Sequence, residues 1–279
     1  MHPKQLLDRY GLAPKQSLGQ NFLHDESLLA RLVTAAEVEP SDEVLEIGPG
    51  LGALTRQLAL AGGRLVSTEL DGRLIPLLEE QLEPFANVEL VQGDILQFDP
   101  SRWFTRPYKV VANVPYYITG AILRHLLESR PRPSRLVLTV QKEVAQRLAA
   151  HPPDMSLLAV SVQYYGVVRQ VATVKAGAFW PRPEVDSAVI RIDVNPSRQD
   201  RDQSSEKAFF RVVRAGFSEK RKQLKNNLRR LGLDDDVIAA TLAASAIDGR
   251  RRAETLAIEE WERLAQELDA IGARANNDS

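Results

Sequence analysis

The sequence predicts an α/β protein: a Rossmann-like, doubly wound and mostly parallel sheet, followed by a small all-helical domain. Between residues 42 and 141, short apolar runs alternate with helical patterns. The runs are centred near Val44, Val66, Val88, Val110 and Val137. Such alternation is typical of a parallel sheet covered by helices. A polar stretch begins at Asn195, and the purely helical patterning beyond it indicates a second domain.

The segments outside that alternation complete the predicted order of elements. Residues 1–20 read as a short N-terminal arm, and residues 25–36 have helical periodicity. Residues 167–174 and 188–193 predict paired strands that close the sheet, whereas residues 156–165 fit a helix or a strand equally well. We therefore expect a first domain over residues 1–195 and a helical domain over residues 196–279. The helices expected there span residues 205–214, 220–231, 234–243 and 258–271.

A glycine-rich loop follows the first predicted strand, residues 43–47. The loop reads Gly48-Pro49-Gly50-Leu51-Gly52, and glycines let a backbone pass close to a ligand. Glu69 closes the next strand, about twenty residues further on, where an acid accepts both ribose hydroxyls of a nucleoside. Asp94 follows the third strand, and its carboxylate could accept a hydrogen bond from an adenine amino group. These strand ends predict a nucleoside-containing cofactor.

The loop alone leaves two cofactors open. Gly48, Gly50 and Ala53 also fit the looser dinucleotide fingerprint of NAD-binding proteins. Pro49, however, removes a backbone donor from a loop that would have to hold a pyrophosphate. No His, Lys or Tyr constellation for hydride transfer is evident either. S-adenosylmethionine carries no phosphate and suits this loop better.

The tetrapeptide Asn113-Val114-Pro115-Tyr116 follows an apolar strand-like run, residues 109–112. It should therefore lie at the edge where open α/β sheets bind ligands. Methylation of a planar aromatic amine needs acceptors that draw the nitrogen toward tetrahedral geometry. The Asn113 side-chain oxygen and a backbone carbonyl near Pro115 could supply them, and the Tyr116 ring could stack on a base. A strand followed by an ordinary X-Pro turn is the alternative for the tetrapeptide alone.

Together these motifs resemble those of the ribosomal RNA adenine dimethyltransferases, in particular the small-subunit branch associated with kasugamycin resistance. The resemblance covers nearly the whole chain, from Gly19-Gln20-Asn21-Phe22-Leu23 to residues 217–224. Residues 179–187 fit the family's Phe-x-Pro-x-Pro-x-Val-x-Ser pattern. Val114 stands where Leu is more frequent, and Lys220 where Arg is usual; Lys lacks the bidentate fork for a phosphate.

The resemblance implies a class I methyltransferase fold with seven strands, one of them antiparallel. It implies transfer of methyl groups from S-adenosylmethionine to two adjacent adenosines near the 3′ end of 16S rRNA, during biogenesis of the small ribosomal subunit. The implied cofactor contacts are Asn21, Leu23, Gly48, Glu69, Asp94 and Asn113. Asn113 and Tyr116, with Phe179, are implied to hold the target adenine.

Basic residues are concentrated in one segment of the predicted second domain. The net charge of the chain is only −1, but residues 207–230 carry nine basic residues against one acid, Glu219. Arg221, Lys225 and Arg229 recur every four residues, so they would share one face of a helix. A basic helical face is typical of phosphate binding, and we expect Arg221, Lys222 and Lys225 to contact RNA. A solvated surface helix is the alternative.

Composition excludes several other classes. The chain has no cysteine, and its four histidines are too scattered for a metal site. The N-terminus lacks the apolar core of a signal peptide, and no apolar run approaches a membrane span. We therefore expect a cytoplasmic monomer that uses neither metal nor membrane. Three rival functions stay open: a 23S rRNA adenine methyltransferase of the macrolide-resistance type, a non-catalytic RNA-binding assembly factor, and a small-molecule methyltransferase.

Overall fold

The computed structural model describes residues 2–199 and 202–277; the outer ends of the expected domains, residues 1 and 278–279, and residues 200–201 lie outside it. The described chain forms two compact units. The first contains residues 2–146 and 166–199, and the second contains residues 147–165 and 202–277. The chain therefore leaves the first unit, returns to it, and leaves again, whereas the sequence predicted a single boundary after residue 195.

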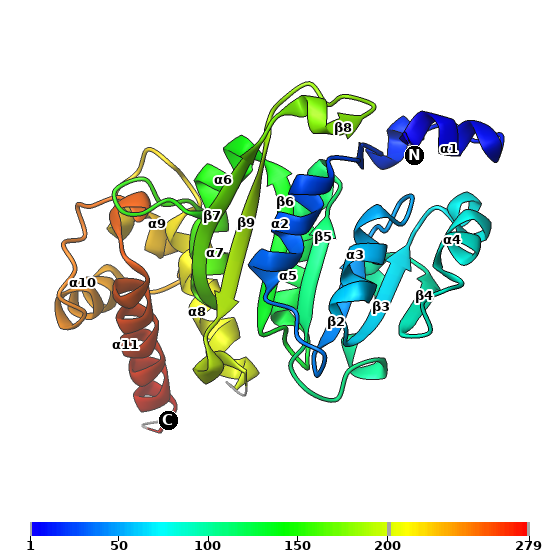
Figure 1. Cartoon of the computed structure of the whole chain (residues 1–279). Helices are drawn as coiled ribbons and strands as arrows, with labels where there is room; N and C mark the ends of the chain where they lie inside the picture. The colour runs from blue at the N-terminus through cyan, green and yellow to red at the C-terminus, as the bar shows by residue number, and fades with distance from the viewer. Residues whose placement is uncertain (1, 200–201, 278–279) are drawn as a thin grey trace. The chain divides into compact units, whose positions relative to one another are not determined.

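A seven-stranded sheet forms the centre of the first unit, with strand order β4-β3-β2-β5-β6-β9-β7 (Figure 1). Its strands are β2 (Glu43–Ile47), β3 (Arg64–Glu69), β4 (Val88–Gln92), β5 (Lys109–Asn113), β6 (Arg135–Gln141), β7 (Gly166–Val174) and β9 (Ser187–Val194). Only β9 runs against its neighbours, because it pairs antiparallel with both β6 and β7. The predicted seven strands with one antiparallel member are confirmed.

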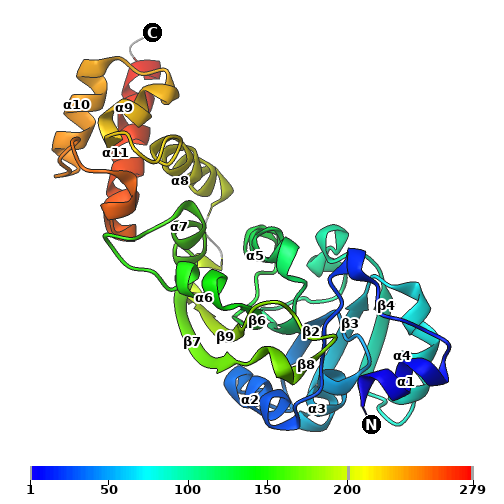
Figure 2. The same cartoon turned by 90° about the horizontal axis from the view of Figure 1, so that it is seen from above.

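Helices cover both faces of this sheet. The first unit contains α1 (Pro3–Arg9), α2 (Glu26–Ala36), α3 (Ala53–Ala61), α4 (Ile75–Leu82), α5 (Thr119–Glu128) and the start of α6 (Lys142–Leu148), whose last two residues belong to the second unit. Figure 2 shows α2 and α3 on one face and α5 on the other. Leu32 of α2 and Leu58 of α3 pack in one cluster with Val111 and Val137 from the sheet, and all four side chains are at most 1% exposed. These four side chains form part of the hydrophobic core between the two helices and the sheet.

A second, two-stranded sheet joins distant parts of the first unit. β1 (Phe22–Leu23) pairs antiparallel with β8 (Phe179–Trp180), so that Phe22 lies opposite Trp180 and Leu23 opposite Phe179. This pairing brings the end of the N-terminal arm to the start of the Phe-x-Pro-x-Pro-x-Val-x-Ser segment. Nothing in the local sequence pattern predicted it.

The second unit is entirely helical. It contains α7 (Leu157–Gln163), α8 (Gln203–Gly216), α9 (Leu224–Leu228), α10 (Asp235–Ala244) and α11 (Ile258–Asn277). The ambiguous segment 156–165 is thus mainly helix. It belongs to this unit because the Tyr164 ring stacks on Phe209 of α8, with ring centroids 4.1 Å apart. Trp261 of α11 is fully buried in the same unit.

The expected continuous helix over residues 220–231 is wrong. Residues 217–223 form turns, α9 begins at Leu224, and a 3₁₀ helix follows at Arg229–Leu231. Asn227 holds the turns in place, since its side-chain Nδ2 donates to the carbonyl oxygens of Gly216 at 2.6 Å and of Glu219 at 3.0 Å. Because Arg221 precedes the helix, it does not share a helical face with Lys225 and Arg229.

Candidate active site

A cavity of about 350 Å³ lies at the carboxyl ends of β2, β3 and β5 in the first unit. Seven of the predicted site residues line it: Asn21, Leu23, Gly48, Glu69, Asp94, Asn113 and Tyr116. The glycine loop and the strand ends meet because parallel strands finish at one edge of the sheet. Asn21 and Leu23 join them through the bond from Asn113 to Asn21 and the pairing of β1 with β8. A volume of this size is within the range of small-molecule sites.

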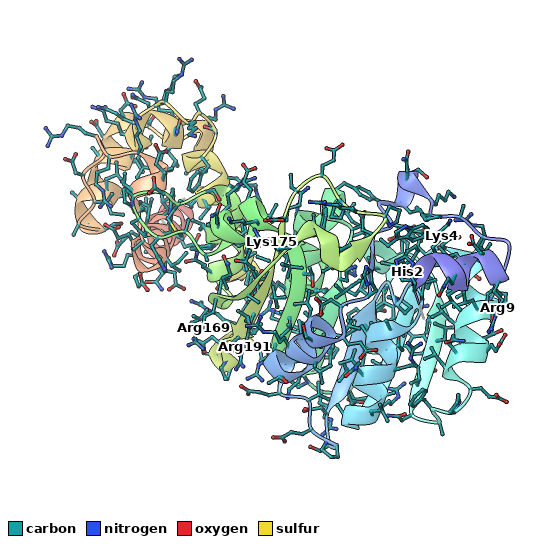
Figure 3. All side chains as sticks on the ribbon, turned by 45° about the horizontal axis from the view of Figure 1, so that its top comes forward. His2, Lys4, Arg9, Arg169, Lys175 and Arg191 are labelled. Atoms are coloured by element: carbon teal, nitrogen blue, oxygen red, sulfur yellow. The ribbon has the colours of Figure 1, made fainter. Side chains whose placement is uncertain are left out.

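The N-terminal arm forms one wall of this cavity. Pro3 and Leu6 of α1 line it, and the labelled side chains of His2, Lys4 and Arg9 mark the helix in Figure 3. His2 caps α1, since its Nδ1 accepts a hydrogen bond from the backbone N–H of Lys4 at 3.2 Å. The arm is therefore an ordered part of the pocket.

The glycine loop adopts backbone angles that side chains would disfavour. Gly48, Gly50 and Gly52 have φ values of +67°, +58° and +77°. A Cβ on Gly50 would also lie 3.0 Å from the Phe22 ring, closer than side chains normally approach. Gly48, by contrast, has open space where its Cβ would be. The loop thus keeps its backbone accessible from the cavity.

Glu69 is held rigidly at the end of β3. Its side chain is 6% exposed, Oε2 accepts from the backbone N–H of Gly50 at 3.1 Å, and Oε1 accepts from that of Asp71 at 2.8 Å. Burial raises the pKa of Glu69, and the two backbone donors oppose that rise. Each carboxylate oxygen keeps lone pairs that can accept further hydrogen bonds.

Asp94 lies on the same side of the cavity, after β4. It caps the 3₁₀ helix Ile95–Gln97, and its Oδ1 accepts from the backbone N–H of Leu96 at 2.9 Å. The other carboxylate oxygen has no hydrogen bond with any residue that the structure describes. That oxygen is available to a ligand donor.

Asn113 ends β5 and carries an unusual buried atom. Its Nδ2 donates to the backbone carbonyl of Asn21 at 3.0 Å. Because a carbonyl oxygen only accepts, this contact fixes the orientation of the side-chain amide. The other amide atom, Oδ1, is buried and has no hydrogen-bond partner among the described residues. A buried acceptor without a donor is costly, and a ligand N–H would satisfy it.

Tyr116 stands beside Asn113 in the 3₁₀ helix Tyr116–Ile118. Its half-buried ring is anchored at the hydroxyl, which lies 2.6 Å from the Ser187 Oγ. Burial raises the pKa of Tyr116, and the bond to Ser187 opposes this. Ser187 is the last residue of the Phe-x-Pro-x-Pro-x-Val-x-Ser segment, so that segment supports the tyrosine. The sequence indicated the motif without revealing this partner.

Phe179 is not brought to the cavity. Its side chain is 3% exposed and packs in the hydrophobic core of the first unit, and it is not among the cavity-lining residues. The pairing of β1 with β8 places it opposite Leu23. The structure therefore departs from the expectation that Phe179 lies against the target base beside Tyr116.

Glu46 is a further buried acid beneath the site, and sequence reasoning missed it. It lies on β2, two residues before Gly48, and is fully buried. Ser67 donates to its Oε2 at 2.8 Å, and burial raises the pKa of Glu46 to about 7. An acid inside an apolar strand is the only sequence signal that could have indicated it.

The basic stretch, defined as residues 207–230 of the second unit, is partly neutralised by nearby acids. Glu219 pairs with Lys222 at 2.9 Å and with Arg230 at 3.2 Å, and Asp235 pairs with Arg229 at 2.8 Å. Arg221 and Lys225 are exposed and form no ion pair with any described residue. Of the three predicted RNA contacts, these two therefore lack an ion pair within the described chain, and Lys225 acts only through space on Asp235, whose pKa is lowered mainly by the hydrogen bond from Arg229 and further by Lys225.

Within residues 2–199 and 202–277, no group of three or more His, Cys, Asp or Glu side chains is placed to hold a metal ion. Likewise, none of the described helices is both long and apolar enough to cross a membrane.

Comparison with known sequences finds relatives over nearly the whole chain. A family model described as ribosomal RNA adenine dimethylase matches residues 11–270. The ribosomal RNA small subunit methyltransferase A of Moorella thermoacetica is 46% identical over 277 residues, covering 94% of this chain and 95% of the relative. The protein of the same name from Dehalococcoides mccartyi (strain CBDB1) is 44% identical over 267 residues, covering 95% and 91%.

Solved structures show the same architecture. The 23S rRNA methyltransferase ErmE is similar with a TM-score of 0.72 and 30% identity, covering 89% of this chain and 100% of that one. A dimethyladenosine transferase from Plasmodium falciparum gives a TM-score of 0.79 at 25% identity, covering 90% and 98%. The fold therefore extends over almost the whole length of both proteins.

Proposed function

The chain belongs to the ribosomal RNA adenine dimethylase family, and from that premise we propose what it modifies. We propose that it transfers methyl groups from S-adenosylmethionine to the exocyclic amines of two adjacent adenosines near the 3′ end of 16S rRNA. Both adenosines would be dimethylated, so the site must accept an amine that already carries one methyl group. The reaction would take place during biogenesis of the small ribosomal subunit.

The unpartnered Oδ1 of Asn113 carries this proposal. The lone pair of an adenine amine is delocalised into the ring, so the amine is a poor nucleophile. Oδ1 can accept one of its hydrogens, and a backbone carbonyl near Pro115 can accept the other. The Pro115 carbonyl already accepts from the Ile118 N–H at 3.3 Å, which favours the carbonyl of Val114. Two such acceptors would draw the nitrogen toward tetrahedral geometry and aim its lone pair.

The residues around the cavity fit the cofactor. Glu69 retains lone pairs for both ribose hydroxyls, and the unengaged oxygen of Asp94 suits an adenine amino group. Asn21, Leu23 and Gly48 complete the proposed contacts. Bound S-adenosylmethionine supplies an electrophilic methyl group. The chain's own contribution is to position the amine in line with that group, and positioning accounts for most of the catalysis.

The adenine must leave its stack to reach this site, because a stacked amine is inaccessible. The Tyr116 ring, held at its hydroxyl by Ser187, would support one face of the extruded base. Phe179 remains a predicted partner for the other face, although its side chain would first have to leave the core. The basic stretch of the second unit, with Arg221, Lys222 and Lys225, would bind phosphates.

The rival targets are less well supported. Identity is 46% and 44% with relatives named for the small subunit, against 30% with the 23S enzyme ErmE. The orphan acceptor at Asn113 opposes a purely non-catalytic assembly factor, since such a protein has no need for it. The exposed cations at Arg221 and Lys225 oppose a small-molecule methyltransferase.

Methyl transfer from labelled cofactor tests the proposal. The protein would be incubated with small ribosomal subunits that lack these methyl groups and, separately, with 23S rRNA. We expect label in 16S rRNA as N6,N6-dimethyladenosine, identified by mass spectrometry of the nucleosides. Label in 23S rRNA instead would reassign the target, and no label in either RNA would contradict the activity.

A further inference from the structure

Tyr117 follows Tyr116 in the chain, but its surroundings are different. Tyr116 is half-buried and bonded to Ser187, whereas Tyr117 is 61% exposed and still lines the same cavity. The Tyr117 hydroxyl has no hydrogen bond with any residue that the structure describes. An exposed aromatic ring at the edge of a ligand cavity is typical of a surface that a ligand covers.

The Tyr117 ring lies beside Gly19 of the N-terminal arm. A Cβ added to Gly19 would lie 3.4 Å from both Cδ1 and Cε1 of Tyr117 and 3.8 Å from the Pro115 Cβ. Gly19 has a φ of +61°, a conformation that favours glycine. The glycine therefore lets the arm support one edge of the ring while most of the ring stays accessible.

The arm loop that supports Tyr117 is also tied to the amine site. Asn113 donates to the backbone carbonyl of Asn21 at 3.0 Å, and the Asn21 Nδ2 donates to the carbonyl of Gly19 at 3.1 Å. Gln20 anchors the same loop, since its Nε2 donates to the Asp71 Oδ2 at 2.8 Å. Tyr117 thus lies beside a loop that is hydrogen-bonded to Asn113.

We propose that Tyr117 is a stacking platform for the base next to the target adenine. The inference rests on the proposed function, because it requires a nucleic-acid substrate. When one adenine is extruded into the cavity, its neighbour in the strand loses a stacking partner. An exposed aromatic ring restores that contact without reading base identity. Tyr117 therefore determines how tightly the RNA is held, while Asn113 and Tyr116 determine which atom is methylated.

Steady-state kinetics on small ribosomal subunits that lack the methyl groups test the platform. Tyr117→Ala should raise KM for the subunits roughly 5- to 150-fold, the range expected for loss of one base–aromatic stack. Tyr117→Phe keeps the ring and should behave as wild type. Val167→Ala is the matched control, because Val167 is 55% exposed but lies on β7 and does not line the cavity.

The effects on KM, kcat and cofactor affinity together distinguish a stacking role from a role in cofactor binding. If Tyr117 stacks on the neighbouring base, Tyr117→Ala should leave kcat and the calorimetric affinity for S-adenosylmethionine within about twofold of wild type. A loss of cofactor affinity instead would show that the ring covers the cofactor, and it would overturn the platform. A KM within about twofold of wild type would overturn it as well.

A change in the RNA, assayed with wild type and with Tyr117→Ala, provides a second test. Small subunits would be reconstituted with one of the two adjacent adenosines replaced by an abasic nucleotide, in either position. Wild type should lose affinity on at least one of these substrates, and Tyr117→Ala should show no further loss on it. Equal losses in both proteins would contradict the inference. The proposed function fails separately, if wild type methylates no unmodified subunit at all.

Discussion

Two polar regions of this protein have proposed functions, and they differ in burial: one consists of buried or half-buried, hydrogen-bonded groups and the other of exposed charges. The amine site, defined as Asn21, Asn113, Tyr116 and Ser187, consists of buried or half-buried groups joined by hydrogen bonds of 2.6 and 3.0 Å. The basic stretch consists of exposed cations, several of which are neutralised by Glu219 and Asp235. A buried acceptor acts at one atom, whereas exposed charges act additively and are screened by salt. Substitutions should therefore have large, specific effects in the first region and small, graded effects in the second.

The largest effect should come from Asn113→Ala. This substitution removes the acceptor that aims the reacting amine, so kcat should fall by roughly 10²- to 10³-fold, as for loss of one polar group at a reacting centre. RNA affinity should stay close to that of wild type, because the basic stretch is unchanged. Single-turnover methylation and filter binding measure the two quantities. Normal turnover in this variant would refute the role assigned to Asn113.

Glu46→Gln tests the buried acid under the glycine loop. Because the pKa of Glu46 is raised from 4.5 to about 7, the folded chain holds a proton there between those pH values that the unfolded chain has released. The free energy of unfolding should therefore fall as pH rises through this window, by up to about 3 kcal/mol. Glutamine should remove that part of the pH dependence. Denaturant unfolding from pH 4 to pH 8 measures the free energy of unfolding. The same pH dependence in wild type and Glu46→Gln would exclude a raised pKa of Glu46.

Glu69→Ala should weaken binding of S-adenosylmethionine by roughly 1.5–3 kcal/mol, the loss expected for hydrogen bonds to a charged group. The effect includes a structural part, because Glu69 also fixes the backbone N–H groups of Gly50 and Asp71. Glu69→Gln, which keeps one acceptor oxygen, should lose less. Calorimetry decides: wild-type affinity in Glu69→Ala, or tight binding of NAD to wild type, would contradict the cofactor assignment.

The smallest effects should come from the basic stretch. Replacing Arg221, Lys222 and Lys225 with Ala should weaken RNA binding at low salt and spare cofactor affinity. The logarithmic salt slope should flatten by roughly 0.7–0.9 for each phosphate that the variant no longer binds. Among single variants, Arg221→Ala and Lys225→Ala should exceed Lys222→Ala, since Lys222 already pairs with Glu219.

Arg229→Ala is the matched control for that series, because Arg229 is engaged by Asp235 through two nitrogens. Titrations of ribosomal subunits at several salt concentrations measure affinity and slope. Identical slopes for wild type and the triple variant would leave these residues as a solvated surface. An effect as large as that of Asn113→Ala would show that the two regions do not differ as proposed.

The sequence by itself determined the order of helices and strands, and it showed that polar residues stand at the carboxyl ends of successive strands. The runs centred near Val44, Val66 and Val110 are strands because apolar β-branched residues at short range favour them. Gly48, Gly50 and Gly52 indicated a loop of positive φ, and those angles are present. Glu69, Asp94 and Asn113 meet in one cavity because parallel strands end together. Each of these inferences depends on a few neighbouring residues or on a general rule of sheet topology.

Only the tertiary structure decided the contacts between distant segments. The partner of Tyr116 is 71 residues away at Ser187, and that of Asn113 is 92 residues away at Asn21. The burial of Phe179, the assignment of α7 to the second unit and the break before Leu224 likewise follow from packing or from hydrogen bonds made elsewhere in the chain. The spacing of apolar residues predicts which side chains of an element are buried, but not which residues they contact. The sequence therefore indicated the chemistry, and the fold supplied the partners that orient it.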